Sequence, residues 1–292
     1  MWAYYGLILL SVVMFGGGFA LQDVYRKMRG SGLKISMESA CIGSLAGLAV
    51  LLIVNGFSFA CTPFTFLMAT WAALNGMAFT FCAFKALDYI NLSLFSVFTM
   101  LGGMVLPFFQ GILFFGEGFT WAKGICVFFI CLALFCTVEK GEKKKGAFFY
   151  AGVFLLNGMS GVITKLYTVS PLPKAGAAGY SIWIALMTAL LSGGIWLILL
   201  RKDGENRIPG KGIFRAYAVG GLSGAINKVG NFLLVIALAH VDASVQYPMV
   251  TGGTMIVSTL LSCLGDRKPR SRELLSVVLA FAGMLALFLL DE

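Results

Sequence analysis

Long runs of apolar residues, separated by short polar or basic segments, dominate the sequence. The runs are continuous rather than alternating, which is typical of helices and not of barrel strands. Each run approaches the roughly 20 apolar residues that a helix needs to cross a bilayer. The pattern predicts ten spans, at about residues 3–22, 35–55, 64–86, 90–115, 119–138, 146–167, 177–200, 213–239, 243–263 and 272–290.

Composition agrees with a chain whose surroundings are mostly lipid. Hydrophobic residues make up 59% of the chain and charged residues 12%, against about 25% charged residues in soluble domains. The net charge of +9 comes from basic residues clustered between the apolar runs. Such clusters are typical of cytoplasmic loops. We therefore expect this basic protein to lie in a lipid bilayer and not to bind nucleic acid.

The sequence repeats at a separation of about 150 residues. Residues 85–93 read KALDYINLS and residues 236–244 read IALAHVDAS. Farther along, Gly102-Gly103 corresponds to Gly252-Gly253, and Gly116-Glu117 corresponds to Gly265-Asp266. Three matches in register predict an internal duplication. We expect one five-helix repeat at residues 1–145 and a second at residues 146–292.

An odd number of spans in each repeat predicts that the two copies cross the membrane in opposite senses. Loop charge supports this independently, because the first, fifth, seventh and ninth loops are basic and the even-numbered loops are nearly free of charge. The predicted fold is therefore an all-α polytopic membrane protein with two inverted five-helix repeats. The positive-inside rule then places both termini outside the cytoplasm.

Lys228 is the first candidate for a functional residue, because it lies near the centre of the eighth predicted span. A charge at the middle of the bilayer costs at least about 2.5–3.5 kcal/mol and usually serves function. The nearest interface is about 15 Å away, which is too far for a lysine side chain to reach. Lys228 must therefore face protein or a hydrated cavity.

Residues around Lys228 give the eighth span a small, polar side. Gly220, Gly224 and Lys228 recur every four residues and so share one helix face. The glycines permit another helix to approach closely. Asn227 and Asn231 form an adjacent polar stripe. We expect this side to border a substrate cavity.

No carboxylate lies near the middle of any predicted span. The acidic residues nearest to the spans lie close to their ends, at Asp23, Glu38, Asp88, Glu117, Asp242 and Asp266. An unpaired buried ammonium is costly. Three outcomes remain open for Lys228: an anionic substrate group neutralises it, it sits uncharged, or amide and tyrosine side chains surround it.

Other polar side chains at depth are Asn75, Asn157 and Tyr247, which we include among the candidate substrate-binding residues. The alternative for each asparagine is a hydrogen bond that joins two helices. The single histidine, His240, excludes a multi-histidine metal site, and the sequence has no GxSxG nucleophile turn. We therefore expect no enzymatic activity and no cofactor.

The chain resembles the drug/metabolite transporter superfamily in its ten-span EamA-like form. The resemblance covers the whole chain in architecture and is most specific at two span pairs. Those pairs carry Ala86-Leu87, Ser93, Gly116-Glu117 and Gly124 in the first half, and Ala237-Leu238, Ser244, Gly265-Asp266 and Gly283 in the second. The segment from Tyr247-Pro248 through Gly252 also resembles the small multidrug resistance branch. The resemblance implies a secondary transporter with a central cavity and alternating access.

This sequence departs from the small multidrug branch in one respect. Those proteins use a glutamate in their first span, whereas the first span here has no acidic residue around Ser11–Phe19. We therefore predict a transporter of a small polar metabolite, such as an amino acid or another solute with an anionic group, in the plasma membrane as a monomer or homodimer. The alternatives are an efflux carrier for amphipathic drugs and a non-transporting membrane assembly protein.

Overall fold

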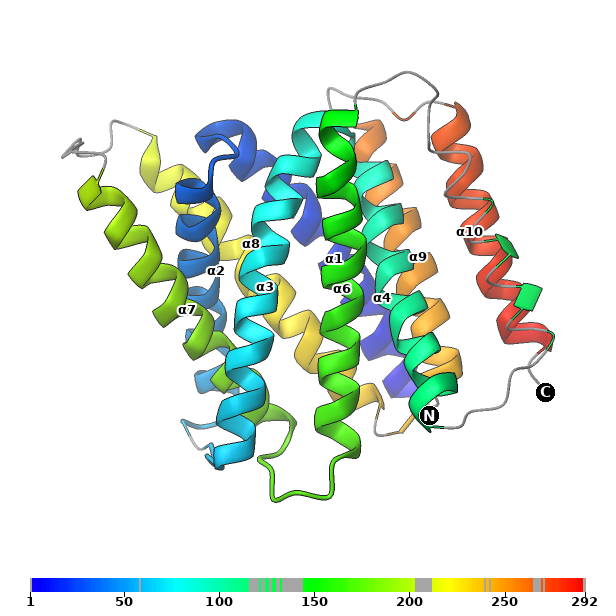
Figure 1. The fold of residues 1–292 in the computed structure, drawn as a ribbon, viewed down its shortest axis with the longest axis horizontal. Coiled ribbons are helices and arrows are strands. Elements are labelled where there is room, and N and C mark those ends of the chain that lie inside the picture. The colour runs from blue at the N-terminus through cyan, green and yellow to red at the C-terminus, as the bar shows by residue number, and fades with distance from the viewer. Residues whose placement is uncertain are drawn as a thin grey trace.

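The computed structural model describes residues 2–57, 59–115, 121, 124–125, 128–129, 132, 144–202, 212–238, 240–241, 243–264, 269 and 271–290. Within these residues there are nine helices and no strand (Figure 1). The helices are α1 (Trp2–Arg29), α2 (Leu33–Val54), α3 (Pro63–Tyr89), α4 (Leu92–Phe115), α6 (Lys144–Val169), α7 (Ala177–Lys202), α8 (Ile213–Leu238), α9 (Ala243–Cys263) and α10 (Ser271–Leu290).

Six helices are long and apolar enough to cross a membrane by length and composition: α1, α2, α3, α6, α7 and α8. Shorter apolar helical segments occupy Leu92–Pro107 in α4 and Met249–Cys263 in α9. These helices confirm the prediction of a helical membrane protein. The fifth predicted span, at residues 119–138, lies mostly outside the described residues, as do Asp242, Gly116-Glu117 and Gly265-Asp266. The count of ten spans therefore stays a prediction.

The first helix is longer than its apolar run. We expected it to end near residue 22 and the basic run to form a loop, but α1 continues to Arg29. The prediction was wrong because the charges of this segment pair with one another and with Asp88 and Glu38. A paired charge does not need to leave the helix for water. Asp88, which we expected in a break, likewise lies inside α3.

Successive helices run in opposite directions from α1 to α4 and again from α6 to α10, whereas α4 and α6 run in the same direction (Figure 1). The start of α1 and the end of α10 lie at one end, which we call the terminal face. The end of α1, the start of α2, the end of α7 and the start of α8 lie at the opposite end. We call this end the basic face, because the last turns of α1 and α7 bring Arg26, Lys27, Arg29, Arg201 and Lys202 to it.

Helices from the first and second halves of the chain pack against each other. In the first half, α1 packs on α8 and α9, α3 packs on α6 and α7, and α2 lies against α7 and α8. The fourth helix, α4, contacts α6 and α9. A core of buried apolar side chains surrounds α4, where Phe95, Val97 and Leu101 are fully buried. This interleaving places residues of both halves around the middle of the bundle.

Candidate functional site

A cavity of about 420 Å³ lies between eight helices, which are α1, α2, α3, α4, α6, α7, α8 and α9. Its volume falls within the range of about 300–1,000 Å³ that is typical of small-molecule sites. Aromatic side chains of Phe15, Phe19 and Phe79 form part of the wall. Amide, hydroxyl and ammonium groups form the rest, so the cavity offers both apolar and polar surface.

Five of the six residues that we proposed from the sequence line this one cavity. They come from three helices: Asn75 from α3, Asn157 from α6, and Asn227, Lys228 and Asn231 from α8. The sixth, Tyr247, lies in α9, and its side chain is outside the described part of the structure. The structure thus brings together residues that are more than 150 positions apart, and their role in binding stays a prediction.

Lys228 lies within one turn of the midpoint of α8 and its stem rests on α2. A Cβ atom at Gly47 would lie 2.6 Å from Lys228 Cγ, and a Cβ atom at Gly224 would lie 2.1 Å from the Cα of Gly43. The close approach that the glycine spacing predicted therefore occurs, with Gly43 and Gly47 of α2 as the partners. This contact fixes the lower stem of Lys228 against helix backbone.

The ammonium of Lys228 has no ion pair and no hydrogen bond in the part of the chain that the structure describes. Among the described residues, no Asp or Glu lines the cavity. Nothing on the described walls therefore neutralises a charge that lies at the depth of the membrane centre.

The asparagines of α8 are fixed by their own helix. Asn227 Nδ2 donates to the Ser223 carbonyl at 2.9 Å, and Asn231 Nδ2 donates to the Asn227 carbonyl at 2.9 Å. Gly18 of α1 leaves room for the Asn227 amide, because a Cβ there would lie 2.4 Å from Asn227 Nδ2. The side-chain oxygens accept no hydrogen bond from described residues and can face a ligand.

Asn75 and Asn157 join helices, as their alternative interpretation predicted. Asn75 Nδ2 donates to the Leu156 carbonyl at 2.8 Å, which links α3 to α6. Asn157 Nδ2 donates to the Thr99 carbonyl at 2.6 Å, which links α6 to α4. Both side chains also line the cavity. A helix-joining amide can therefore present its remaining oxygen to a ligand.

The sequence did not reveal a hydroxyl-rich wall formed by α6 and α7. Five residues contribute to it: Ser160, Thr164, Tyr180, Ser181 and Thr188. The spacing of Ser160 and Thr164 by four residues, and of Ser181 and Thr188 by seven, places each pair on one helix face. This spacing was a usable signal, but hydroxyl side chains are common in membrane helices and do not stand out by charge.

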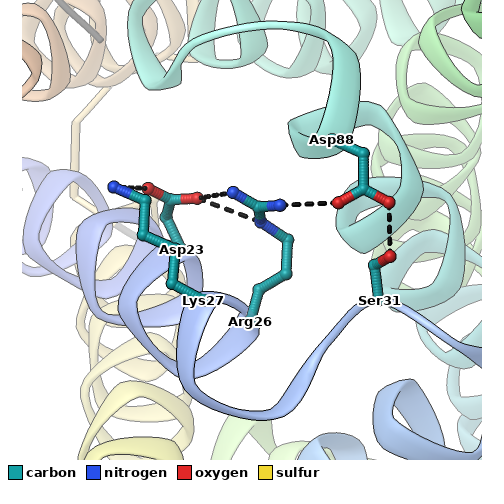
Figure 2. Close-up of polar contacts among 5 residues, drawn as sticks. All are labelled: Asp23, Arg26, Lys27, Ser31 and Asp88. Atoms are coloured by element: carbon teal, nitrogen blue, oxygen red, sulfur yellow. Dashed lines mark hydrogen bonds and ion pairs between the residues drawn. The ribbon is translucent and has the colours of Figure 1, made fainter. Parts of the chain in front are cut away.

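A charge cluster lies at the basic face beyond the cavity, and Figure 2 shows its five residues. The Arg26 guanidinium lies between two carboxylates, with Nη2 2.7 Å from Asp23 Oδ1 and Nη1 2.6 Å from Asp88 Oδ1. Lys27 Nζ lies 3.2 Å from the other oxygen of Asp23, and the Ser31 hydroxyl donates to the other oxygen of Asp88. The cluster ties the end of α1 to the end of α3.

A second ion pair ties α1 to α2. Arg29 binds Glu38 through two hydrogen bonds of 2.9 Å, from Nε and Nη2. The Tyr25 hydroxyl donates to the same carboxylate at 2.6 Å. The Tyr25 ring lies against Gly220, where a Cβ would be 2.8 Å from Tyr25 Cε2. Because Gly220 lines the cavity, the ring of Tyr25 lies next to the basic-face end of the cavity.

The cavity reaches closer to the terminal face than to the basic face. Tyr180 lies in the first turn of α7 and Val235 in the last turn of α8, and both ends are at the terminal face. At the basic face, the nearest lining residues are Ser39 and Gly220, which lie nearly two turns inside α2 and α8. The ion pairs of Arg26 and Arg29 lie beyond Ser39 and Gly220, toward the basic face.

Among the described residues, no group of three or more His, Cys, Asp or Glu side chains could hold a metal ion. The described walls of the cavity offer an ammonium group, amides and hydroxyls around a space for a small molecule.

The sequence matches no family model and no curated protein. The structure is similar to 28 chains of solved structures. One of them, described only as "Crystal structure of protein", has a TM-score of 0.60 and 16% sequence identity. The match covers 97% of this chain and 97% of that chain. At this identity the similarity shows that the fold is shared over the whole length.

Proposed function

We propose that this protein is a secondary transporter that moves a small organic anion, or a metabolite carrying an anionic group, across the membrane. One observation carries the proposal: Lys228 places a cation without a partner among the described residues in a central cavity lined by polar side chains. A buried charge without a counter-ion is costly. An anionic group of a ligand would offset that cost by pairing with the Lys228 ammonium.

The packing of the helices supports two related halves. If residues 1–145 and 146–292 are inverted copies, α1 corresponds to α6, α2 to α7, α3 to α8 and α4 to α9. The packing of α1 on α8 then has its counterpart in α6 on α3, and the packing of α1 on α9 has its counterpart in α6 on α4. The contacts α2–α8 and α7–α3 form a third pair. An architecture of this kind, with a site between the repeats, is typical of secondary transporters.

The resemblance to the EamA-like drug/metabolite transporters supports the same function, and alternating access follows from it. The cavity reaches nearer to the terminal face, while Tyr25 and the ion pairs of Arg26 and Arg29 lie across the other end. In our proposal these contacts hold the basic face closed, and the opposite state requires them to separate. In our proposal this face, with its basic residues, lies in the cytoplasm and the protein lies in the plasma membrane, as the positive-inside rule favours.

An efflux carrier for amphipathic cations is the second candidate within the same fold. Its expected feature is a carboxylate at depth, and among the described residues Asp23, Glu38 and Asp88 instead lie near helix ends in ion pairs. Lys228 would repel a cationic ligand. A non-transporting assembly protein is the third candidate, and it gives no reason for a cation in a central cavity.

A thermal-shift measurement on the purified protein tests the proposal. The probes are a panel of small carboxylates, amino acids and phosphate monoesters, with tetraphenylphosphonium as the amphipathic cation. We expect organic anions to raise the melting temperature of the parent, because a ligand that binds the folded state stabilises it by RT ln(1 + [L]/Kd). In Lys228→Ala this shift should vanish, while the melting temperature without ligand stays equal or rises.

Lys228→Arg is the matched control for charge. The flat guanidinium is larger and offers a different donor geometry, so we expect it to weaken the anion shift as well. A Lys228→Ala protein that melts earlier but keeps its anion shift would make Lys228 architectural and overturn the assignment. A shift with tetraphenylphosphonium alone would favour the efflux carrier, and no shift with any probe would overturn the transporter proposal.

A further inference from the structure

Three phenylalanine rings line one part of the cavity, and a fourth ring supports two of them. Phe15 and Phe19 come from α1 and Phe79 comes from α3. Phe95 of α4 is fully buried. Its ring centroid lies 5.3 Å from that of Phe19 at an interplanar angle of 84°, and 6.5 Å from that of Phe79 at 45°. Aromatic rings favour such edge-on and tilted contacts, so Phe19 and Phe79 are held in place before a ligand arrives.

Phe15 extends this aromatic wall to α8. A Cβ atom at Gly230 would lie 3.5 Å from Phe15 Cε1, so the ring lies against the backbone of α8. Phe15 is 8% exposed and Phe19 is 6% exposed, whereas Phe79 is only partly buried. Of the three rings, Phe79 therefore has the most surface that protein atoms leave uncovered.

The hydroxyl groups beside these rings are already bound within the protein. Thr80 Oγ1 donates to the Gly76 carbonyl at 2.9 Å, and Ser223 Oγ donates to the Gly18 carbonyl at 2.9 Å. Phenyl rings hold water only weakly, so an apolar group displaces water from them at a gain in free energy. The aromatic wall therefore favours an apolar group of a ligand over a polar one.

The contact of Gly18 with Asn227 brings the aromatic wall close to Lys228. A Cβ atom at Gly18 would lie 2.4 Å from Asn227 Nδ2. Phe19 follows Gly18 on α1 and Lys228 follows Asn227 on α8, and both residues line the cavity. Because the axes of packed helices lie about 8–10 Å apart, one short molecule can reach both the ammonium and the rings.

We infer that Phe15, Phe19 and Phe79 form an apolar subsite beside Lys228, which receives a compact apolar group of the anion that Lys228 binds. The inference rests on the proposed function, because Lys228 holds the charged end of the same ligand. The ligand class is therefore a short amphipathic anion, such as a carboxylate or phosphate monoester that carries a ring. Its charged end lies at α8 and its apolar end between α1 and α3.

Ring burial would give this subsite its selectivity. A wall that is already packed loses little side-chain entropy when a ligand binds, so most of the gain from burial appears as affinity. A phenyl group that leaves water for this wall should raise affinity by about tenfold or more. An anion without an apolar group gains only the pairing with Lys228.

Matched probe pairs test the subsite. The pairs are propionate with 3-phenylpropionate, and propyl phosphate with 3-phenylpropyl phosphate; the members of each pair differ by one phenyl group. We expect the parent to bind the phenyl member more tightly, with Kd determined from the ligand dependence of the melting temperature. In Phe79→Ala the phenyl member should lose roughly fivefold to tenfold in affinity, and the other member should be unchanged.

Phe81→Ala is the matched control. Phe81 lies two positions from Phe79 on α3 and packs against the same core, but its ring meets Phe149 of α6 at 6.1 Å and does not line the cavity. This variant should melt earlier than the parent without ligand and keep the preference for the phenyl member.

Phe79→Leu is a milder replacement that keeps an apolar side chain in the wall, and it serves the test even where Phe79→Ala does not fold. The phenyl member should lose roughly twofold to fivefold in affinity, because the contact between rings is lost while apolar surface remains.

The outcomes also separate the two proposals. A preference for the phenyl member that is unchanged in Phe79→Ala and Phe79→Leu would overturn the subsite and leave the transporter proposal intact, provided Lys228→Ala abolishes both shifts. Equal binding of both members by the parent would likewise overturn the subsite alone. The neutral analogue 3-phenylpropanol should bind weakly, and binding as tight as that of 3-phenylpropionate would overturn the role of Lys228 instead. If no anion of the wider panel or of these pairs stabilises the parent, both proposals fail.

Discussion

Arg26 Nη1 lies 2.6 Å from Asp88 Oδ1, which joins the last turn of α1 to the last turn of α3. The two helices carry separate walls of the cavity, at Phe15 and Phe19 on α1 and at Asn75 and Phe79 on α3. Their ends meet at the basic face through this ion pair (Figure 2). In the proposed transport cycle, opening the cavity toward that face separates Arg26 from Asp88.

Asp88→Asn should make the basic face easier to open. The variant removes the charge that attracts Arg26, while Asp23 still binds the guanidinium, so we expect the free energy of unfolding to fall by only about 1 kcal/mol. Gln22, which lines the cavity below the cluster, provides the measurement. In a cysteine-free background, Gln22→Cys should react faster with a membrane-impermeant thiol reagent applied at the basic face.

Lys27→Gln is the control for this prediction, because its ion pair with Asp23 lies within α1. The reagent should label Gln22→Cys in the Lys27→Gln background at the parent rate. Equal rates in the parent and Asp88→Asn would show that the ion pair does not hold this face closed.

Gly224→Ala should destabilise the protein more than Gly221→Ala. A Cβ at Gly224 would lie 2.1 Å from Gly43 Cα, so the two backbones must move apart. We expect a loss of about 1–3 kcal/mol, which is typical of overpacking. At Gly221 the nearest atom would be the Ala46 Cβ at 3.5 Å, an ordinary contact. Unfolding of the two variants in the same detergent gives the comparison, and equal stabilities would contradict the crossing of α2 and α8.

Gly47→Ala should affect ligand binding through Lys228. The added methyl would come within 2.6 Å of Lys228 Cγ and displace the stem. We expect the protein to fold, because a side chain can shift where a backbone cannot, but the thermal shift with the anion panel should shrink. An unchanged shift would mean that the ammonium reaches its ligand independently of the α2 surface. Gly17→Ala, with nothing within 4 Å of its Cβ, is the control.

A reporter fusion tests the orientation. With the basic segments in the cytoplasm, a fluorescent protein that matures only there should be bright when inserted before α6, at residues 139–143. The same reporter fused after Glu292 should be dark. A bright C-terminal fusion of a correctly folded protein would reverse the orientation, and the proposed cytoplasmic side of the charge cluster with it.

The helices could be predicted from the sequence because a helix that crosses lipid needs a long run of apolar residues. Apolar runs of sufficient length gave the positions of α2, α6, α7, α8 and α9 to within about two residues. Lys228 could also be identified from the sequence, because a cation in the middle of an apolar run has few structural roles. The position of the site on α8 follows from local sequence alone.

The charge cluster at the basic face could not be predicted in the same way. Arg26 and Asp88 are 62 positions apart, and nothing local indicates that they pair. Because the sequence does not reveal this ion pair, the predicted end of α1 lies too early in the chain.

Lys174 is a basic residue in one of the even-numbered loops, which are otherwise nearly free of charge. It follows α6 at the terminal face and donates to the carbonyls of Tyr167 at 3.1 Å and Ser170 at 2.8 Å. Cations at a helix C-terminus are stabilised by the unpaired carbonyls and the helix dipole. Its position there reflects local capping and carries no information about membrane orientation.

The contact between Gly43 and Gly224 also limits how the molecule can move. Two helix backbones that touch directly have no layer of side chains between them that could repack as the helices slide. A sliding motion would separate the chains at once, so α2 and α8 travel as one rigid body. Lys228 and the surface of Gly47 behind it belong to that body. In the proposed transport cycle, a substrate on Lys228 would therefore stay bound to the same group of atoms while the surrounding helices change which side of the membrane it can reach.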